Sequence, residues 1–209
     1  MTGIVNMVGC GPGGASWVLP QARATVERCD IVFGPSDLQS LFPEAAVPRV
    51  DLPARPDAAA PLVRAALERG LSCAVLVRGD CGVRSLARGL ERLLPPGSCR
   101  RVPGISSVQA ACAAFGVDWD EARIVSAHGR DPGELDADTL RAPALVLLGG
   151  GDGFGAVVDR LAAAHASTRR HIASDLTLPS ECIRTYNLGE PLPADHPSRT
   201  VAILCKEPS

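Results

Sequence analysis

Short apolar runs alternate with amphipathic segments along the first half of the chain. The runs at 4–8 and 73–77 are too short for helices and rich in strand-forming residues, so they predict buried strands. The segment 58–69 instead carries apolar side chains at helical spacing, at Leu62, Val63, Ala66 and Leu67. Gly70 follows directly and is a natural stop for that helix. The pattern therefore switches between strand and helix.

The same alternation covers the whole first half. Strands are expected at 4–8, 31–33, 73–77 and 100–102, with an extended segment at 47–52. Helices are expected at 20–28, 37–41, 58–69, 83–94 and 107–114. Because strands that alternate with helices of this length form βαβ units, we expect a mostly parallel sheet.

The rhythm changes after residue 116. Strands are expected at 124–126, 144–148, 171–173, 182–186 and 200–204, whereas one strong helix is expected, at 154–164. Since strands outnumber helices here, some strands should pair antiparallel. The fold class is therefore α/β, with two domains: a mostly parallel one over 1–117 and a mixed-sheet one over 118–209.

Composition adds little to the fold but excludes several function classes. The 209 residues carry a net charge of −2, so no basic footprint indicates nucleic acid. No leader-like segment opens the chain, and no apolar run is long enough for a membrane helix. Of 21 basic residues, 20 are arginine and Lys206 is the one lysine. We attribute most of this excess to base composition of the gene and a few arginines to binding of carboxylates or phosphates.

The eight cysteines do not form a metal or disulfide pattern. No two of them stand in a Cys-x-x-Cys pair, so a zinc site has no support. Four lie in apolar runs, as buried thiols do: Cys10, Cys73, Cys112 and Cys205. We expect a reduced, cytoplasmic protein without a metal site.

The first motif follows the first strand, at Gly9-Cys10-Gly11-Pro12-Gly13-Gly14. It fits the G-x-G-x-x-G pattern of dinucleotide-binding folds, which predicts an NAD-dependent oxidoreductase. Two features weaken that interpretation. The helix begins only near Pro20, and no acid ends the strand at 31–33. A different ligand loop, or a plain turn, remains open.

Two further loops follow strands of the same predicted sheet. One is Arg78-Gly79-Asp80-Cys81-Gly82-Val83, and the other is Val102-Pro103-Gly104-Ile105-Ser106-Ser107. Asp80 could meet a cationic or hydroxylated ligand, or it could cap the next helix. One serine of the second loop should cap its helix, which leaves the other for a polar ligand. Because ligands bind at the carboxyl ends of parallel strands, the three loops predict one ligand-binding rim.

The second domain offers two weaker candidates. His128 and Arg130 follow the strand at 124–126, where the histidine could act as a base and the arginine could bind an anion. Gly149-Gly150-Gly151-Asp152-Gly153 follows the strand at 144–148 and allows a planar ligand to approach, or forms a flexible turn. No nucleophile elbow and no phosphate-binding lysine motif is present.

Taken together, these motifs resemble those of the tetrapyrrole (corrin and porphyrin) methyltransferase family. The order and spacing of the segments 8–14, 79–80 and 102–107 carry the likeness, which extends over essentially the whole chain. Within the family, the segments 105–109 and 126–130, with Trp119, are most similar to enzymes of cobalamin biosynthesis that methylate carbon 5, the precorrin-6Y/cobalt-precorrin-7 type.

The resemblance implies a cofactor, S-adenosylmethionine, in a cleft between two α/β domains. By the family pattern, the cofactor would touch Pro12, Arg78, Gly79, Asp80, Val83, Ser106, Ser107 and Leu148. The macrocycle's acidic side chains would meet Arg84 and Arg130, with His128 on the substrate side. The resemblance also implies a homodimer. We expect the decarboxylating carbon-15 methylation, which some relatives carry out on the same chain, to need a separate protein.

Three departures from the family pattern bear on this interpretation. Cys81 stands where the family usually has proline, Val83-Arg84-Ser85 replaces an aromatic-rich turn, and Gly14-Ala15 replaces a frequent acidic residue. A diverged, non-catalytic tetrapyrrole-binding subunit is therefore a further hypothesis. No residue is identified as the catalytic base.

Overall fold

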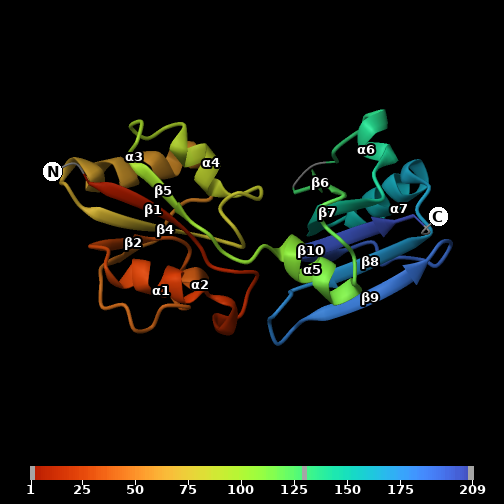
Figure 1. Cartoon of the computed structure of the whole chain (residues 1–209), viewed down its shortest axis with the longest axis horizontal. Coiled ribbons are helices and arrows are strands. Elements are labelled where there is room, and N and C mark those ends of the chain that lie inside the picture. Colours follow the sequence, from red (N-terminus) through yellow and green to blue (C-terminus); the bar gives the residue numbers. More distant parts are fainter. Residues whose placement is uncertain (1–2, 129–130, 207–209) are drawn as a thin grey trace. The chain divides into compact units, whose positions relative to one another are not determined.

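Two five-stranded sheets organise the chain, one in each half (Figure 1). The computed structural model describes residues 3–128 and 131–206. Its residues divide into two units, 1–106 and 107–209. The α/β class with two sheets is as the sequence predicted.

The sheet of the first unit is entirely parallel, with strand order β3-β2-β4-β1-β5. Its strands are β1 (Ile4–Gly9), β2 (Ile31–Phe33), β3 (Arg49–Val50), β4 (Ser72–Val77) and β5 (Cys99–Val102). The helical elements are η1 (Ala15–Trp17), α1 (Pro20–Glu27), α2 (Ser36–Gln39), α3 (Pro56–Glu68) and α4 (Leu86–Glu91). Each expected strand and helix of this unit is present.

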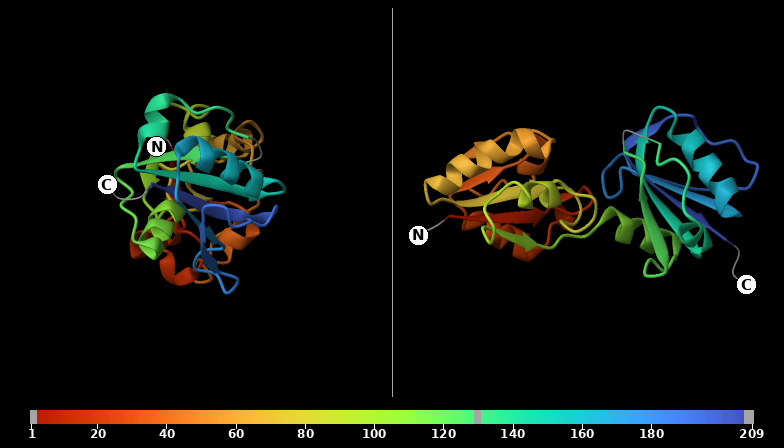
Figure 2. Two further views of the ribbon diagram at one scale, coloured as in Figure 1. Left: turned by 90° about the vertical axis from the view of Figure 1, so that its right-hand side faces the viewer. Right: turned by 90° about the horizontal axis from the view of Figure 1, so that it is seen from above.

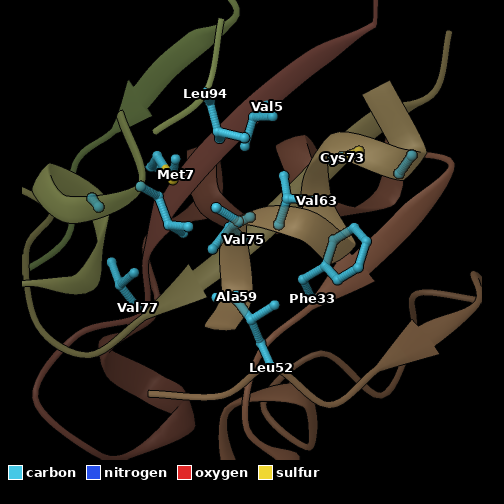
Figure 3. Packing of buried hydrophobic residues seen from close by; sticks show 14 of the residues in the cluster. Val5, Met7, Phe33, Leu52, Ala59, Val63, Cys73, Val75, Val77 and Leu94 are labelled. Carbon is cyan, nitrogen blue, oxygen red and sulfur yellow. The ribbon is translucent and has the colours of Figure 1, made fainter. Parts of the chain in front are cut away.

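Helices cover both faces of this sheet because its central strands are apolar on both sides. Met7 and Val75 contact the layer of α3 and α4, as Figure 3 shows. Val8 and Leu76, the next residues along each strand, contact the layer of α1. Successive side chains of a strand point to opposite faces, so a continuous apolar run buries both. Figure 1 shows α3 and α4 on one face, with α1 and α2 on the other.

In this sheet the strand order reverses at one point, which lies between β1 and β4. The two strands are neighbours, but the chain leaves β1 toward α1 and leaves β4 toward α4, on the opposite face. In open parallel sheets, ligands bind outside the carboxyl ends of the strands at such a point. The fold itself therefore selects the segments that follow β1 and β4.

Helix ends differ from the sequence prediction for local reasons. Pro56 is the first residue of α3, where its fixed φ favours helix and its missing N–H is not needed, so α3 starts before residue 58. Conversely, α4 starts only at Leu86 instead of 83. Arg84, two residues before this start, has φ of 48°, outside the helical region.

The sheet of the second unit is mixed, as predicted, with strand order β6-β7-β10-β8-β9. Its strands are β6 (Ala122–Ser126), β7 (Ala144–Gly151), β8 (Arg169–Ser174), β9 (Cys182–Asn187) and β10 (His196–Cys205). The helices are α5 (Ser107–Phe115), α6 (Ala137–Arg141) and α7 (Phe154–His165). β6 and β7 run parallel, and the other neighbours pair antiparallel. The sequence pattern missed the five-residue α6, which Asp136 caps by accepting from the Thr139 N–H.

Helix α5 belongs with the second unit, although the sequence placed the boundary after residue 117. Its side chains pack against β10, and the ring of Phe115 stacks on His171 with 4.5 Å between ring centroids. The other face of the sheet is covered by α7, which Figure 2 shows along the strands. None of the described helices has the length and apolar character needed to cross a membrane.

A buried histidine joins α7 to the end of α6. The Nε2 of His165 lies 2.7 Å from the carbonyl oxygen of Ala142, and its Nδ1 lies 2.6 Å from the hydroxyl of Ser167. Because a carbonyl can only accept, Nε2 carries the proton, and Nδ1 of the neutral ring accepts from Ser167. The folded unit therefore favours neutral His165.

We predict that stability falls when the pH drops below the ordinary histidine range. Burial lowers the pKa of His165, His171 and His196, so protonation favours the unfolded chain. The stability they contribute is complete above a pH of about 6.5 and is lost below it. The melting temperature should be nearly constant above about pH 6.5 and should fall as the pH drops below it, less steeply in His165→Gln. A flat profile would contradict this.

Candidate functional site

The three glycine-bearing loops of the first unit meet at one edge of the parallel sheet. Gly11 and Gly79 exchange backbone hydrogen bonds of 3.2 and 2.9 Å, which joins the loop after β1 to the loop after β4. The N–H of Gly104, after β5, donates to the Asp80 carboxylate at 3.0 Å. We call residues 9–14, 78–82 and 103–105 the strand-end rim. The three loops meet as the sequence predicted, and the binding of a ligand there stays a prediction.

The glycines of the rim allow one backbone to approach another. A Cβ on Gly104 would lie 2.4 Å from the carbonyl oxygen of Gly79, and one on Gly9 would lie 2.6 Å from the Gly104 nitrogen. Gly79 itself has φ of 62°, in the left-handed region. No other residue type fits these contacts without movement of the loops. The glycines therefore hold the loops together, whatever the rim binds.

Asp80 is the polar centre of the rim. One of its carboxylate oxygens accepts from the Gly82 N–H at 2.7 Å, and the other accepts from the Gly104 N–H at 3.0 Å. It does not cap α4, because Ser85 occupies the N-cap position of that helix. A carboxylate has about four acceptor positions, so Asp80 can still accept from a ligand.

Arg78 is ion-paired with Asp37, at the start of α2. Both side chains are about half exposed, 46% and 48% respectively, so the pair lies at the surface of the rim. The sequence analysis singled out Arg78 but gave no role to Asp37. Asp37 follows β2, and Arg78 follows β4, its neighbour in the sheet. The position of Asp37 just after a strand was therefore the sequence signal that could have indicated this pair.

Cys81 turns inward from the rim. Its thiol lies 3.0 Å from the Met7 carbonyl oxygen and 3.2 Å from that of Val102, so it bonds to β1 and β5. Burial, and after it the neighbouring Asp80, raise its pKa to about 11. Burial also raises the pKa of Cys10 to about 12. Both thiols are thus protonated near neutral pH, and neither is a nucleophile.

Of the other predicted site residues of the first unit, Pro12 lies in the rim, whereas Val83, Arg84 and Ser106 follow its loops directly along the chain. Pro12 and Val83 are half-buried, and Arg84 is exposed. The turn is tied back by Ser85, whose hydroxyl donates to the Cys81 carbonyl oxygen at 2.6 Å. Ser106 is buried and directly precedes α5, so it holds the position of an N-cap residue.

The remaining predicted residues belong to the second unit. Ser107 is the first residue of α5, and Leu148 is buried in β7, where it pairs with Val201 of β10. His128 is exposed after β6. Arg130 lies outside the described residues. The roles of these residues stay predictions.

The second unit has its own opening at the carboxyl ends of its two parallel strands. The N–H of Ala127, after β6, donates to the Leu148 carbonyl oxygen at 2.7 Å. A cavity of about 590 Å³ lies beside this contact and is lined by Asp131, Asp152 and the start of α7. A cavity of this size is in the range of small-molecule sites.

The glycines at the end of β7 fall into two groups, according to the space around each of them. A Cβ on Gly149 would lie 2.4 Å from the ring of Phe154, and one on Gly150 would lie 2.0 Å from the Pro197 carbonyl oxygen. A Cβ on Gly151 or Gly153 would meet nothing within 4 Å, and both have positive φ. The first two glycines are thus required by packing, whereas the later two face open space.

The rim lacks the features of a dinucleotide site. In such a site, backbone N–H groups of the glycine loop and a helix that opens within it bind a pyrophosphate. Here the N–H of Cys10 donates to Val77, the N–H of Gly11 donates to Gly79, and α1 begins only at Pro20. The literal glycine pattern therefore reflects loop packing in this chain.

Comparisons with known proteins agree on one group. Residues 5–192 match the profile of the tetrapyrrole (corrin/porphyrin) methylases. The chain is 32% identical over 133 residues to a cobalt-precorrin-7 C(5)-methyltransferase of Salmonella typhimurium, an alignment that covers 61% of this chain and 62% of the relative. The match thus spans less than two thirds of either protein.

Solved structures share the fold over nearly the whole chain. The methyltransferase CobJ has a TM-score of 0.81 at 20% identity, covering 99% of this chain and 95% of CobJ. The precorrin-6Y methylase of Archaeoglobus fulgidus gives 0.73 at 24% identity, covering 98% and 99%. A uroporphyrin-III C-methyltransferase of Thermus thermophilus, complexed with S-adenosylhomocysteine, gives 0.77 at 19% identity, covering 97% and 92%.

We predict that Asp80→Asn destabilises the first unit by about 1–3 kcal/mol, because an amide oxygen replaces only one of the two acceptor atoms. The change leaves either the Gly82 or the Gly104 N–H without its partner. Asp152→Asn is the matched control, because Asp152 is exposed and its side chain forms no hydrogen bond with the part of the chain that the structure describes. Urea denaturation measures both. Equal stability of the two variants would contradict the role given to Asp80.

Proposed function

The chain belongs to the tetrapyrrole (corrin/porphyrin) methylase family, and we propose that it methylates carbon 5 of a precorrin-type macrocycle in cobalamin biosynthesis. The methyl donor of this family is S-adenosylmethionine. The observation that carries the carbon-5 assignment is the 32% identity to the cobalt-precorrin-7 enzyme. The structures of CobJ and of the precorrin-6Y methylase support the fold.

The strand-end rim suits a cofactor that is positively charged and rich in hydroxyl groups. Its Asp80 carboxylate has acceptor capacity beyond its two backbone bonds, and a second carboxylate, that of Asp37, lies beside the rim in an ion pair with Arg78. Pro12 and Val83, both half-buried, add apolar surface beside them. We assign cofactor contact to Pro12, Gly79, Asp80 and Val83, together with Arg78, Ser106, Ser107 and Leu148 from the family pattern.

When bound, S-adenosylmethionine supplies an electrophilic methyl group on a sulfonium that departs as a neutral thioether. The protein then has little covalent chemistry to perform, in accord with the protonated thiols of Cys10 and Cys81. Its main task is orientation, which can contribute up to about 7–11 kcal/mol to catalysis. The tied loops of the rim provide a rigid base for that task.

Arginines would recognise the acidic side chains of the macrocycle. Arg84 is exposed on the turn after Asp80, and its φ of 48° is rare for a side chain of this size. Such backbone strain often marks functional positions. We assign Arg84 and Arg130 to substrate carboxylates and His128 to the substrate side. A homodimer and a separate carbon-15 methyltransferase remain part of the proposal.

Cofactor binding is the first test. We expect S-adenosylhomocysteine to raise the melting temperature, since a ligand at a hundred times its Kd stabilises by about 2.7 kcal/mol. NAD at the same concentration should leave it unchanged. Isothermal titration gives the stoichiometry. Stabilisation by NAD but not by S-adenosylhomocysteine would overturn the proposal in favour of an oxidoreductase.

Product analysis is the second test. The chain is incubated with methyl-labelled S-adenosylmethionine and with intermediates of the cobalt-precorrin-7 pathway. We expect one labelled methyl group on carbon 5 of the product, and carbon NMR locates it. Transfer to another carbon would refute the carbon-5 assignment while leaving methyl transfer intact. Cofactor binding without transfer to any precorrin would instead support the non-catalytic subunit.

We predict that Arg84→Gln raises the KM for the tetrapyrrole about tenfold, because loss of one guanidinium–carboxylate pair costs about 1.4 kcal/mol or more. The affinity for S-adenosylhomocysteine should not change. Arg88→Gln, on the exposed side of α4, is the control. An unchanged KM in Arg84→Gln would remove this residue from the substrate site.

A further inference from the structure

A polar pocket lies between α1 and the edge strand β5, and Pro103 is the one lining residue that it shares with the strand-end rim. Its volume is about 290 Å³, and its lining comes from both ends of the first unit's sequence, from Ile4 to Pro103. Asn6 and Thr25, which are 8% and 7% exposed, form its buried polar part. We call it the α1–β5 pocket.

The charge of the lining is of one sign. It includes Arg28 and Arg100 and no aspartate or glutamate. Arg101 also lines the pocket, but it pairs with Met7 in the register, so its guanidinium points to the other face of the sheet and meets Glu91 there. The chain as a whole has 23 acidic and 21 basic residues, so this lining departs from the average surface. A pocket with only positive charges favours an anion.

Two of these arginines are available to a ligand. Arg101 is occupied, because its guanidinium donates to both carboxylate oxygens of Glu91, at 2.7 and 2.5 Å. Arg28 and Arg100 are exposed, and no carboxylate among residues 3–128 and 131–206 forms an ion pair with either. Eight other arginines do have such partners in the described chain.

The fold brings these two arginines to the same face of the sheet. Arg100 pairs with Asn6 in the parallel register of β1 and β5, so the two side chains point the same way. Asn6 points toward α1, because its amide donates to the Cys29 sulfur at 3.5 Å. Arg28 is the C-cap residue of α1, directly before Cys29. Arg28 and Arg100 therefore approach the pocket from the helix and from the strand.

We propose that the α1–β5 pocket binds a small molecule with two or three oxyanion groups, held by Arg28 and Arg100. A guanidinium presents paired N–H donors that match the oxygens of a carboxylate or a phosphate. The side chains of Gln21 and Ser72 line the same pocket and add neutral donors. Its volume is at the lower end of ligand sites, which suits a small ligand and excludes a tetrapyrrole macrocycle.

The proposal does not rest on the function proposed above. The pocket shares Pro103 with the rim, but Arg28 and Arg100 lie outside the rim, and the rim contact to Asp80 is made by Gly104. Loss of the oxyanion site should thus leave the affinity for S-adenosylhomocysteine unchanged. That affinity serves as an internal control for the fold of each variant, and failure of either proposal leaves the other testable.

The test uses isothermal titration of the full chain with pyrophosphate and with citrate, at constant ionic strength. We expect at least one probe to bind with a stoichiometry of one, and the stronger of the two shows whether phosphate or carboxylate is preferred. The double variant Arg28→Gln/Arg100→Gln should weaken that binding at least tenfold. The control Arg69→Gln/Arg88→Gln removes the same charge from exposed positions elsewhere in the unit and should change it less than twofold.

A conservative variant separates the paired donors of the arginine from its charge. Arg100→Lys keeps the positive charge but loses the fork of N–H donors, so we expect an intermediate loss of affinity. The proposal is overturned if neither probe binds the wild-type chain, if both double variants lose affinity equally, or if Arg28→Gln/Arg100→Gln binds as the wild type does.

Discussion

The Asp80 carboxylate and the backbone contacts around it fix the loops on which the function depends. Asp80 accepts from Gly82 in its own loop and from Gly104 after the neighbouring strand, while Gly79 bonds to Gly11. Three loops that are distant in sequence thus share one hydrogen-bonded centre. Because that centre sits where the strand order reverses, its geometry decides what the edge of the sheet can bind.

The same contacts explain why the glycine pattern is misleading when taken alone. A G-x-G-x-x-G run after a strand predicts close approach of a pyrophosphate. In this fold the close approach is made by other backbone segments, at Gly79 and Gly104. Cys81 links the loop after β4 to the strands β1 and β5, since its thiol contacts the Met7 and Val102 carbonyl oxygens. The departure at Cys81 is therefore accommodated within the core and leaves the rim intact.

Much of the fold could be predicted because its strands are apolar runs with few alternatives. The run at 73–77 is buried on both faces in β4, and the strand excess after residue 116 became a mixed sheet. Short elements escaped detection because local side-chain contacts determine them, as the Asp136 cap does for α6. The boundary between the units lies before α5 instead of after it, because α5 packs on β10. The sequence of α5 does not indicate which sheet the helix packs on.

The candidate site was partly predictable for the same reason. Loops that follow neighbouring parallel strands must meet, so the rim could be expected from strand order. Side-chain partners could not, because the pairing of Arg78 with Asp37 depends on the placement of β2 beside β4. The α1–β5 pocket gave no sequence signal, since Asn6, Arg28 and Arg100 are far apart along the chain.

A crystal structure with S-adenosylhomocysteine tests the central claim most directly. We expect the ligand against the strand-end rim, with Asp80 still accepting from Gly82 and Gly104 and with the Gly11–Gly79 hydrogen bonds retained. A ligand bound away from the rim would contradict the account. So would a rim that opens on binding, with the Asp80 bonds broken.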